Sequence, residues 1–180
     1  MRGSWLLLVL LLVGCGGGEK AAPTERSSKL SGPTACHALL SAPGYRGCGR
    51  PYPSQIERGD GSVVVGSVEY RGGAAARGFW RTAMISPDGK TLLAQWSGEC
   101  ELQKAFFVAA TGGASKPVTG EADWATGPES EALGWEGARA RVRLPKRGEA
   151  VSVKPGIYLI DPRTFRRTLV RPIAGGRGCS

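Results

Sequence analysis

The chain has 180 residues, and its 24 lysines and arginines outnumber its 15 aspartates and glutamates to give a net charge of +9. Its 28 glycines lie between short apolar runs, and long helical periodicity is absent. The sequence has no Gly-x-Ser-x-Gly elbow, phosphate-binding loop, dinucleotide fingerprint or zinc-protease helix, so the enzyme classes that use these motifs lose their main support. We predict an all-β class, with residues 34–180 as a single domain.

Residues 1–14 have the features of a secretory signal peptide. Arg2 precedes an apolar core at residues 5–13, which is too short for a permanent membrane span. The end of this core, Leu12-Val13-Gly14-Cys15, resembles the bacterial lipobox, in which the cysteine becomes the lipidated first residue of the mature protein. We therefore expect a lipid anchor at Cys15 that holds the protein on the extracytoplasmic side of a bacterial membrane.

Residues 15–33 follow as a lipidated cysteine and a flexible stalk. The stalk is rich in Gly, Ser, Pro, Lys and Glu and has no apolar periodicity, so it cannot bury enough surface to fold. The sequence does not distinguish between an inner membrane, an outer membrane and a cell surface.

Four cysteines remain in a compartment that permits disulfides, and they are Cys36, Cys48, Cys100 and Cys179. They allow three pairings, which the sequence alone does not separate. We favour Cys36 with Cys48, which closes a short loop, and Cys100 with Cys179, which ties down the C-terminus. The spacing lacks the Cys-x-x-Cys pattern of zinc sites, so we expect no metal and no other cofactor.

The domain begins with a segment that we expect to be a helical turn at residues 36–40, followed by a long strand at residues 62–70 with a kink at Gly66. His37 is the single histidine of the chain and stands beside Cys36, an arrangement that would also fit a Cys-His nucleophile. We favour the disulfide at this position, because a secreted cysteine with a partner available is usually bridged.

The clearest hairpin has an incoming strand at residues 78–85 and an outgoing strand at residues 91–96. Pro87, Asp88 and Gly89 supply the turn between them. Ser86-Pro87-Asp88-Gly89-Lys90 followed by an apolar strand resembles the repeat of TolB-type β-propellers, bacterial relatives of WD-repeat blades, and the likeness extends to about Thr119. The resemblance implies a scaffold for binding partners whose repeat carries no catalytic residues.

A second, degenerate unit follows at residues 132–171, after a first unit at residues 78–119. Its strands are expected at residues 139–144, 156–161 and 167–171, and aligning Gly137 with Gly89 gives a period of 137 − 89 = 48 residues, within the range of propeller blades. Two units cannot close a propeller. We expect them to pack as a small sandwich or partial propeller in a monomer, with association of copies as the alternative.

The positive charge is concentrated at the end of the chain, because residues 139–180 carry 11 Lys or Arg against two acidic residues. Arg139, Arg141 and Arg143 alternate with apolar residues, as on one exposed face of a strand. The conservative interpretation is a solvated strand that resists edge pairing. The functional interpretation is contact with an anionic envelope polymer, to which a lipid anchor would bring the domain close. Nucleic acid is not an expected partner.

Aromatic and acidic residues give weaker functional signals. Trp96 and Trp135 are expected to be core residues, whereas Trp124 lies in a polar loop and is the best candidate for a binding contact. Glu99 and Glu101 would suit glycoside chemistry, but we expect a solvated pair. We therefore predict a non-catalytic lipoprotein that binds an envelope protein or an anionic envelope polymer, with a small hydrolase acting on envelope material as the alternative.

Overall fold

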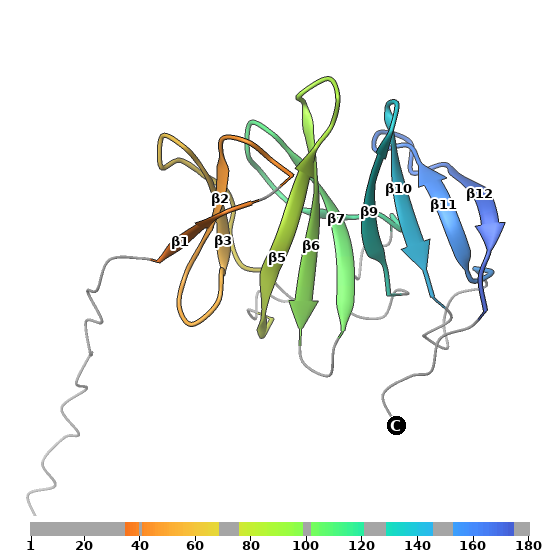
Figure 1. Ribbon diagram of the computed structural model, residues 1–180, viewed down its shortest axis with the longest axis horizontal. Coiled ribbons are helices and arrows are strands. Elements are labelled where there is room, and N and C mark those ends of the chain that lie inside the picture. Colours follow the sequence, from red (N-terminus) through yellow and green to blue (C-terminus); the bar gives the residue numbers. More distant parts are fainter. Residues whose placement is uncertain are drawn as a thin grey trace, which may run out of the picture. The chain divides into compact units, whose positions relative to one another are not determined.

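The chain divides into two units, Met1–Gly32 and Pro33–Ser180. The computed structural model describes residues of the second unit, namely 35–39, 41–68, 76–98, 102–120, 129–145 and 153–174. Every regular element in these ranges is a β-strand, so the predicted all-β class is confirmed (Figure 1). No helix long and apolar enough to cross a membrane occurs in the same ranges.

The strands form three antiparallel sheets of four strands each. The first sheet contains β1 (Cys36–Ala38), β2 (Tyr45–Cys48), β3 (Gln55–Arg58) and β4 (Val63–Val65). The second contains β5 (Gly78–Ile85), β6 (Thr91–Gly98), β7 (Gln103–Ala109) and β8 (Lys116–Pro117). The third contains β9 (Glu131–Glu136), β10 (Arg139–Leu144), β11 (Gly156–Ile160) and β12 (Arg167–Pro172). Strands adjacent in the chain are adjacent in each sheet, so every sheet has up-and-down topology.

The two predicted units correspond to the second and third sheets. The expected strands at residues 78–85 and 91–96 are β5 and β6, which pair from Ile85↔Leu92 to Gly78↔Gly98. Gly89 has the positive φ of 70° that its turn requires. The expected strands at residues 139–144, 156–161 and 167–171 are β10, β11 and β12, because turn residues and short apolar runs mark them clearly in the sequence.

The first sheet was not predicted as a sheet, and the helical turn expected at residues 36–40 is wrong. Cys36–Ala38 is strand β1, and it pairs with β2 in the register Cys36↔Cys48 and Ala38↔Arg46. A short apolar run fits a strand as well as a helical turn, and here the pairing with β2 and the disulfide at its end favour the strand.

The long strand expected at residues 62–70 is also shorter than predicted. Only Val63–Val65 forms a strand, Gly66 to Val68 do not, and residues 69 and 70 lie outside the described ranges. The reason is at Gly66, whose carbonyl accepts a hydrogen bond of 2.9 Å from Nε1 of Trp80 on β5. A side chain of another sheet therefore satisfies the first carbonyl beyond the strand.

The middle sheet is buried on both faces, which explains why β6 is apolar at successive positions from Leu92 to Trp96, with Gln95 as the one exception. One face packs against the first sheet in a cluster that includes Trp80, Leu92, Trp96 and Phe106 from the middle sheet and Ile56 from the first. The opposite face packs against the third sheet in a second cluster: Leu93, Ala105, Phe107 and Val118 meet Ala140, Val142, Leu144, Tyr158 and Ile160. Alternation along each strand assigns successive side chains to the two clusters.

Gln95 is a buried polar residue on the face toward the third sheet, with 4% of its surface exposed. Its Nε2 donates to the carbonyls of Trp96 and Ser130, both at 3.2 Å, and its Oε1 accepts from the backbone N–H of Ala132 at 2.7 Å. A buried amide without partners would destabilise the fold by about 1–3 kcal/mol. Here the amide is satisfied, and its bonds join the middle sheet to the third.

Trp96 is 2% exposed, which confirms the prediction that it is a core residue. Its indole lies over the cross-strand pair Gly78↔Gly98. A Cβ added at Gly78 would meet Cζ2 of Trp96, and one added at Gly98 would meet Cη2 of the same ring. Glycine is therefore needed at both positions for close approach of the ring.

We predict that Gly78→Ala and Gly98→Ala each lower the free energy of unfolding by about 1–3 kcal/mol, because the added methyl overlaps the Trp96 ring. Urea unfolding of the purified variants measures this. Gly66→Ala is the matched control, since the space around its Cβ position is open. A midpoint for Gly78→Ala equal to that of the control would contradict the close packing of Gly78 against the Trp96 ring.

Candidate functional site

The three predicted arginines lie on the side of β10 that faces away from the middle sheet. Ala140, Val142 and Leu144 are buried in the second cluster, so the alternating residues Arg139, Arg141 and Arg143 point to the opposite side. The predicted alternation is confirmed.

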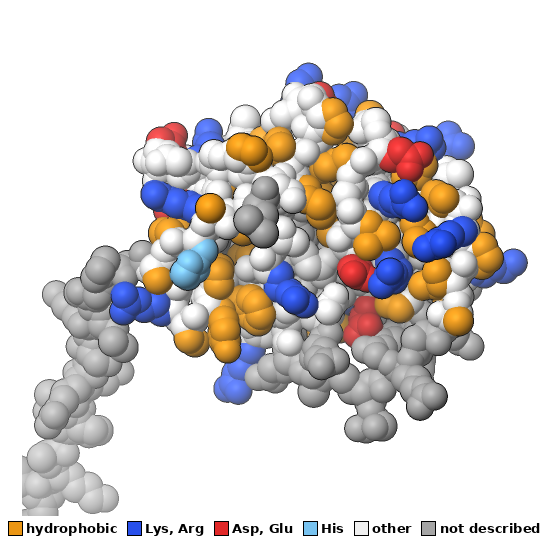
Figure 2. Space-filling model, in the orientation of Figure 1, with side chains coloured by type: hydrophobic (Ala, Val, Ile, Leu, Met, Phe, Trp, Pro, Cys, Tyr) orange, Lys and Arg blue, Asp and Glu red, His pale blue; other side chains and the backbone are white. Residues whose placement is uncertain are grey.

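Acidic residues of β9 offset much of this charge. Nη1 of Arg143 lies 2.7 Å from Oε2 of Glu131, and Nη1 of Arg141 lies 4.0 Å from Oε2 of Glu136. The three arginines and two glutamates together carry 3 − 2 = +1, and Figure 2 shows basic and acidic side chains interleaved over the third sheet. Exposed pairs contribute about 0–1 kcal/mol each, but they weaken the field that would attract an anionic polymer.

Several other predicted site residues lie outside the described ranges. These are the lipidation residue Cys15, the disulfide candidates Cys100 and Cys179, the binding candidate Trp124, and the carboxylates Glu99 and Glu101. The lipidation, disulfide, binding and carboxylate roles expected of these residues stay predictions.

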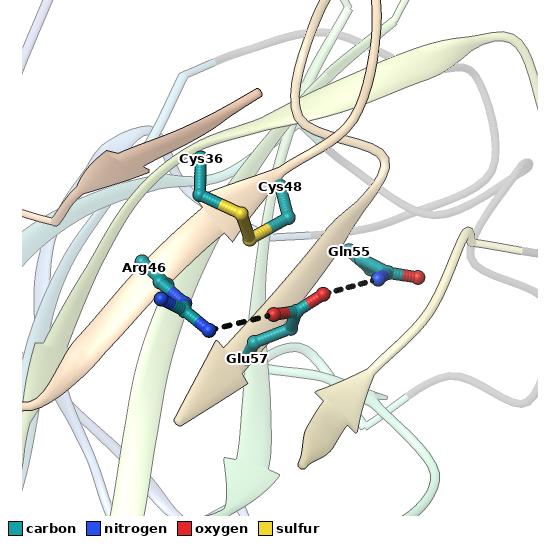
Figure 3. Close-up of a disulfide and its surroundings, with 5 residues drawn as sticks. All are labelled: Cys36, Arg46, Cys48, Gln55 and Glu57. Atoms are coloured by element: carbon teal, nitrogen blue, oxygen red, sulfur yellow. Dashed lines mark hydrogen bonds and ion pairs between the residues drawn. A yellow bond between two sulfur atoms is a disulfide. The ribbon is translucent and has the colours of Figure 1, made fainter. Parts of the chain in front are cut away.

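The predicted disulfide between Cys36 and Cys48 is present, on the outer side of the first sheet (Figure 3). Glu57 lies beside it and is held by Nη2 of Arg46 at 3.4 Å and Nε2 of Gln55 at 2.6 Å. The two sulfurs and the Glu57 carboxylate are close enough together to suggest a metal site, but bridged sulfurs are not thiolates and do not serve as ligands in that form. For the same reason Cys36 cannot act with His37 as a nucleophile.

A pocket of about 400 Å³ opens where turns of the second and third sheets meet. We call it the turn pocket. Its lining consists of two proline-containing turns, the end of β9 and the β9–β10 turn: Ser86, Pro87, Asp88, Lys90, Thr91, Trp135, Ala138, Asp161, Pro162 and Arg163. The volume lies in the range of sites for small molecules.

The first wall is the β5–β6 turn, which is held by side-chain hydrogen bonds. Oδ1 of Asp88 accepts from Oγ of Ser86 at 2.7 Å and from the backbone N–H of Lys90 at 3.1 Å. Oγ of Ser86 also accepts from the N–H of Thr91 at 2.9 Å. Pro87 restricts the backbone further. The turn is therefore a fixed structure, and both bonds to the Asp88 carboxylate end on one oxygen.

The second wall is the β11–β12 turn. Oδ1 of Asp161 accepts from the backbone N–H groups of Arg163 and Thr164, both at 2.9 Å. The turn closes at Phe165, which has a φ of 58°, a conformation that is rare for a bulky residue. Phe165 packs against Phe107 of the middle sheet with ring centroids 5.9 Å apart. This packing anchors the turn to the core and keeps Phe165 in its unfavourable conformation.

Trp135 of β9 forms a side of the pocket between these walls. It is half-buried, so the prediction that it belongs to the core is correct for only part of its surface. Its Nε1 donates to the carbonyl of Met84 at 3.0 Å, and its ring lies 6.2 Å from that of Phe107. The indole is thus fixed in orientation while part of it lines the pocket.

Four charged side chains line the pocket, and their charges sum to zero: Asp88 and Asp161 against Lys90 and Arg163. Hydrogen bonds from Ser86 and from the N–H of Lys90 lower the pKa of Asp88, and the charge of Arg163 across the pocket contributes. The N–H groups of Thr164 and Arg163 lower the pKa of Asp161. Both carboxylates are therefore ionised at neutral pH and are poor proton donors.

The sequence predicts the turn at residues 86–90 but not the pocket. The sequence does contain a usable signal for the two turns. In Ser86-Pro87-Asp88 and in Asp161-Pro162-Arg163, the side chain of the residue before the proline accepts a hydrogen bond from a backbone N–H of the same turn. Lys104 of β7 is buried, at 2% exposure, which the sequence does not indicate.

Comparisons of the chain with protein-family models, with curated proteins and with solved structures found no match.

The lowered pKa values predict how Asp88 contributes to stability. A carboxyl whose pKa falls below 3.8 on folding stabilises the protein fully above that pH, and the contribution is lost as the pH falls through the folded-state pKa. Asp88→Asn should therefore have a melting temperature that decreases less than that of the wild type below about pH 4. Glu136→Gln on β9 is the control. Superimposable pH profiles for wild type and Asp88→Asn would contradict the assignment.

Proposed function

We propose that the protein is a bacterial envelope lipoprotein whose β domain binds a partner without chemical turnover. The anchor is supported by the apolar core at residues 5–13 and the lipobox-like Leu12-Val13-Gly14-Cys15. A lipidated Cys15 followed by a stalk through residue 33 would place the domain outside the cytoplasmic membrane, at an envelope surface.

We further propose that the three sheets are blades of a partial propeller related to the TolB-type repeat. Each sheet is a meander of four consecutive strands, which is the topology of a propeller blade. The resemblance of residues 86–90 to that repeat falls in the β5–β6 turn of the middle sheet. The outer faces carry ion pairs, Arg46 with Glu57 on the first sheet and Arg143 with Glu131 on the third, which favours a monomer.

The observation that carries the binding function is the turn pocket. Its carboxylates are held ionised by hydrogen bonds within their own turns, whereas a hydrolase of the glycosidase type needs one carboxyl with a raised pKa as its general acid. The residues that line the pocket include no histidine or cysteine, and the buried Ser86 hydroxyl is engaged within its own turn by Asp88 and by the N–H of Thr91. Fixed, charged and aromatic groups of this kind suit recognition. The partner is an envelope protein or an envelope polymer.

The anchor is tested by Cys15→Ser. This variant should leave the membrane fraction or remain unprocessed, because the thiol that takes the lipid is gone. Fractionation and the mass of the mature protein measure this. A Cys15→Ser protein that stays in the membrane fraction with the mature mass of the wild type would contradict the lipoprotein proposal.

Binding without turnover is tested by capturing envelope material on the full-length protein and analysing both protein and polysaccharide. Arg163→Gln should reduce capture, because it alters the turn pocket. The combined change of Arg139, Arg141 and Arg143 to Gln should have the smaller effect, since Glu131 and Glu136 offset that face. Steep loss of capture with salt in the wild type but not in the triple variant would instead favour the basic face. Cleavage of the captured material would favour the hydrolase alternative.

A further inference from the structure

The turn pocket contains charged groups that are not used up by the fold. Among the described residues, neither Lys90 nor Arg163 has an ion-pair partner within 4.0 Å, and Oδ2 of Asp88 accepts no hydrogen bond. Donors and acceptors therefore remain available on both walls. Asp88, Lys90 and Arg163 line the same pocket, so the unused groups of the two turns face one space and can engage one small ligand together.

The balance of charge in the pocket disfavours strongly charged ligands. An anion such as phosphate would be attracted by Lys90 and Arg163 but repelled by the two ionised carboxylates. A divalent cation would be attracted by the carboxylates but repelled by Lys90 and Arg163. Neither would find a net opposite charge. A ligand whose groups both donate and accept hydrogen bonds satisfies all four side chains, and hydroxyl groups do so. The arginine fork can bond two adjacent oxygens at once.

Apolar side chains also line the pocket. The Trp135 indole and the rings of Pro87 and Pro162 line the same pocket as the charged groups. A pyranose ring has C–H groups that lie on an aromatic face and hydroxyls that point outward around its edge. An aromatic side chain is well suited to such a ligand because it presents a large apolar surface with little conformational freedom to lose.

The pocket is also built before any ligand arrives. The Trp135 indole is fixed by its bond to Met84 and its contact with Phe107, and the Asp88 and Asp161 carboxylates are each held by two hydrogen bonds. Little side-chain entropy is lost when a ligand binds groups that are already ordered. The small loss of side-chain entropy matters because little free energy is gained when sugar hydroxyls replace water as hydrogen-bond partners.

We propose that the turn pocket binds a sugar unit of an uncharged glycan, with Trp135 as the stacking surface and Asp88, Asp161, Lys90 and Arg163 bonding the hydroxyls. The inference rests on the proposed binding function and specifies its ligand class. A short peptide is the competing ligand, because its positive N-terminus and negative C-terminus could pair with the carboxylates and the cations of the pocket.

The experiment uses the full-length lipid-anchored protein in a zwitterionic detergent, since sugar-based detergents would compete for the site. The probes are maltotriose, chitotriose, tri-alanine and inorganic phosphate, each titrated while the indole N–H signal of Trp135 is followed by NMR. Trp135→Phe identifies that signal by its loss. We expect a saturable shift with at least one trisaccharide and none with phosphate.

Arg163→Gln should weaken trisaccharide binding about tenfold or more, equivalent to about 1.4 kcal/mol. Arg166→Gln is the matched control, because it removes the same charge from the same exposed turn without lining the pocket. No response to either trisaccharide, a response to tri-alanine or phosphate alone, or equal binding by Arg163→Gln would overturn the inference. If envelope capture persists while both trisaccharides are silent, the binding function stands and the sugar assignment fails.

Discussion

Burial of both faces of the middle sheet is the constraint on which the domain depends. A strand with two buried faces needs apolar side chains at successive positions, and β6 supplies them from Leu92 to Trp96 with the single interruption of Gln95. That interruption is tolerated because the amide bonds to Ser130 and Ala132 at the entry to the third sheet. The same residue that would otherwise destabilise the core thus fixes where the next sheet begins.

The position of the turn pocket follows from this packing. Trp135 can line the pocket because it reaches across to the Met84 carbonyl on β5, and the β11–β12 turn is held near the β5–β6 turn by the contact of Phe165 with Phe107. Core contacts between sheets therefore set the distance between two turns that have no backbone hydrogen bond to each other among the described residues. Rigid sheets with functional turns at their ends are a common division of roles in β proteins.

The sequence predicted strands well where a strong turn stood beside a long apolar run, as at Pro87-Asp88-Gly89 before β6. It failed at β1, where pairing with β2 and the disulfide to Cys48 favour a strand, and it extended β4 too far, because the strand ends at Val65 and the next carbonyl, that of Gly66, bonds the Trp80 indole. Local propensity carries no information about such partners. The turn pocket escaped prediction for a related reason, since Asp88 and Asp161 are far apart in the chain and only tertiary packing brings their turns together.

The ion pairs on the outer faces limit how this architecture can be enlarged. A fourth sheet placed against the first would cover Arg46 and Glu57, and desolvating such a pair carries a penalty of several kcal/mol per ion. A sheet inserted between two existing ones would instead meet apolar faces on both sides. A longer protein of this design would therefore arise more easily by duplication of the middle sheet than by extension at either end, and its first and last sheets would keep their charges as terminal caps do in other repeat proteins.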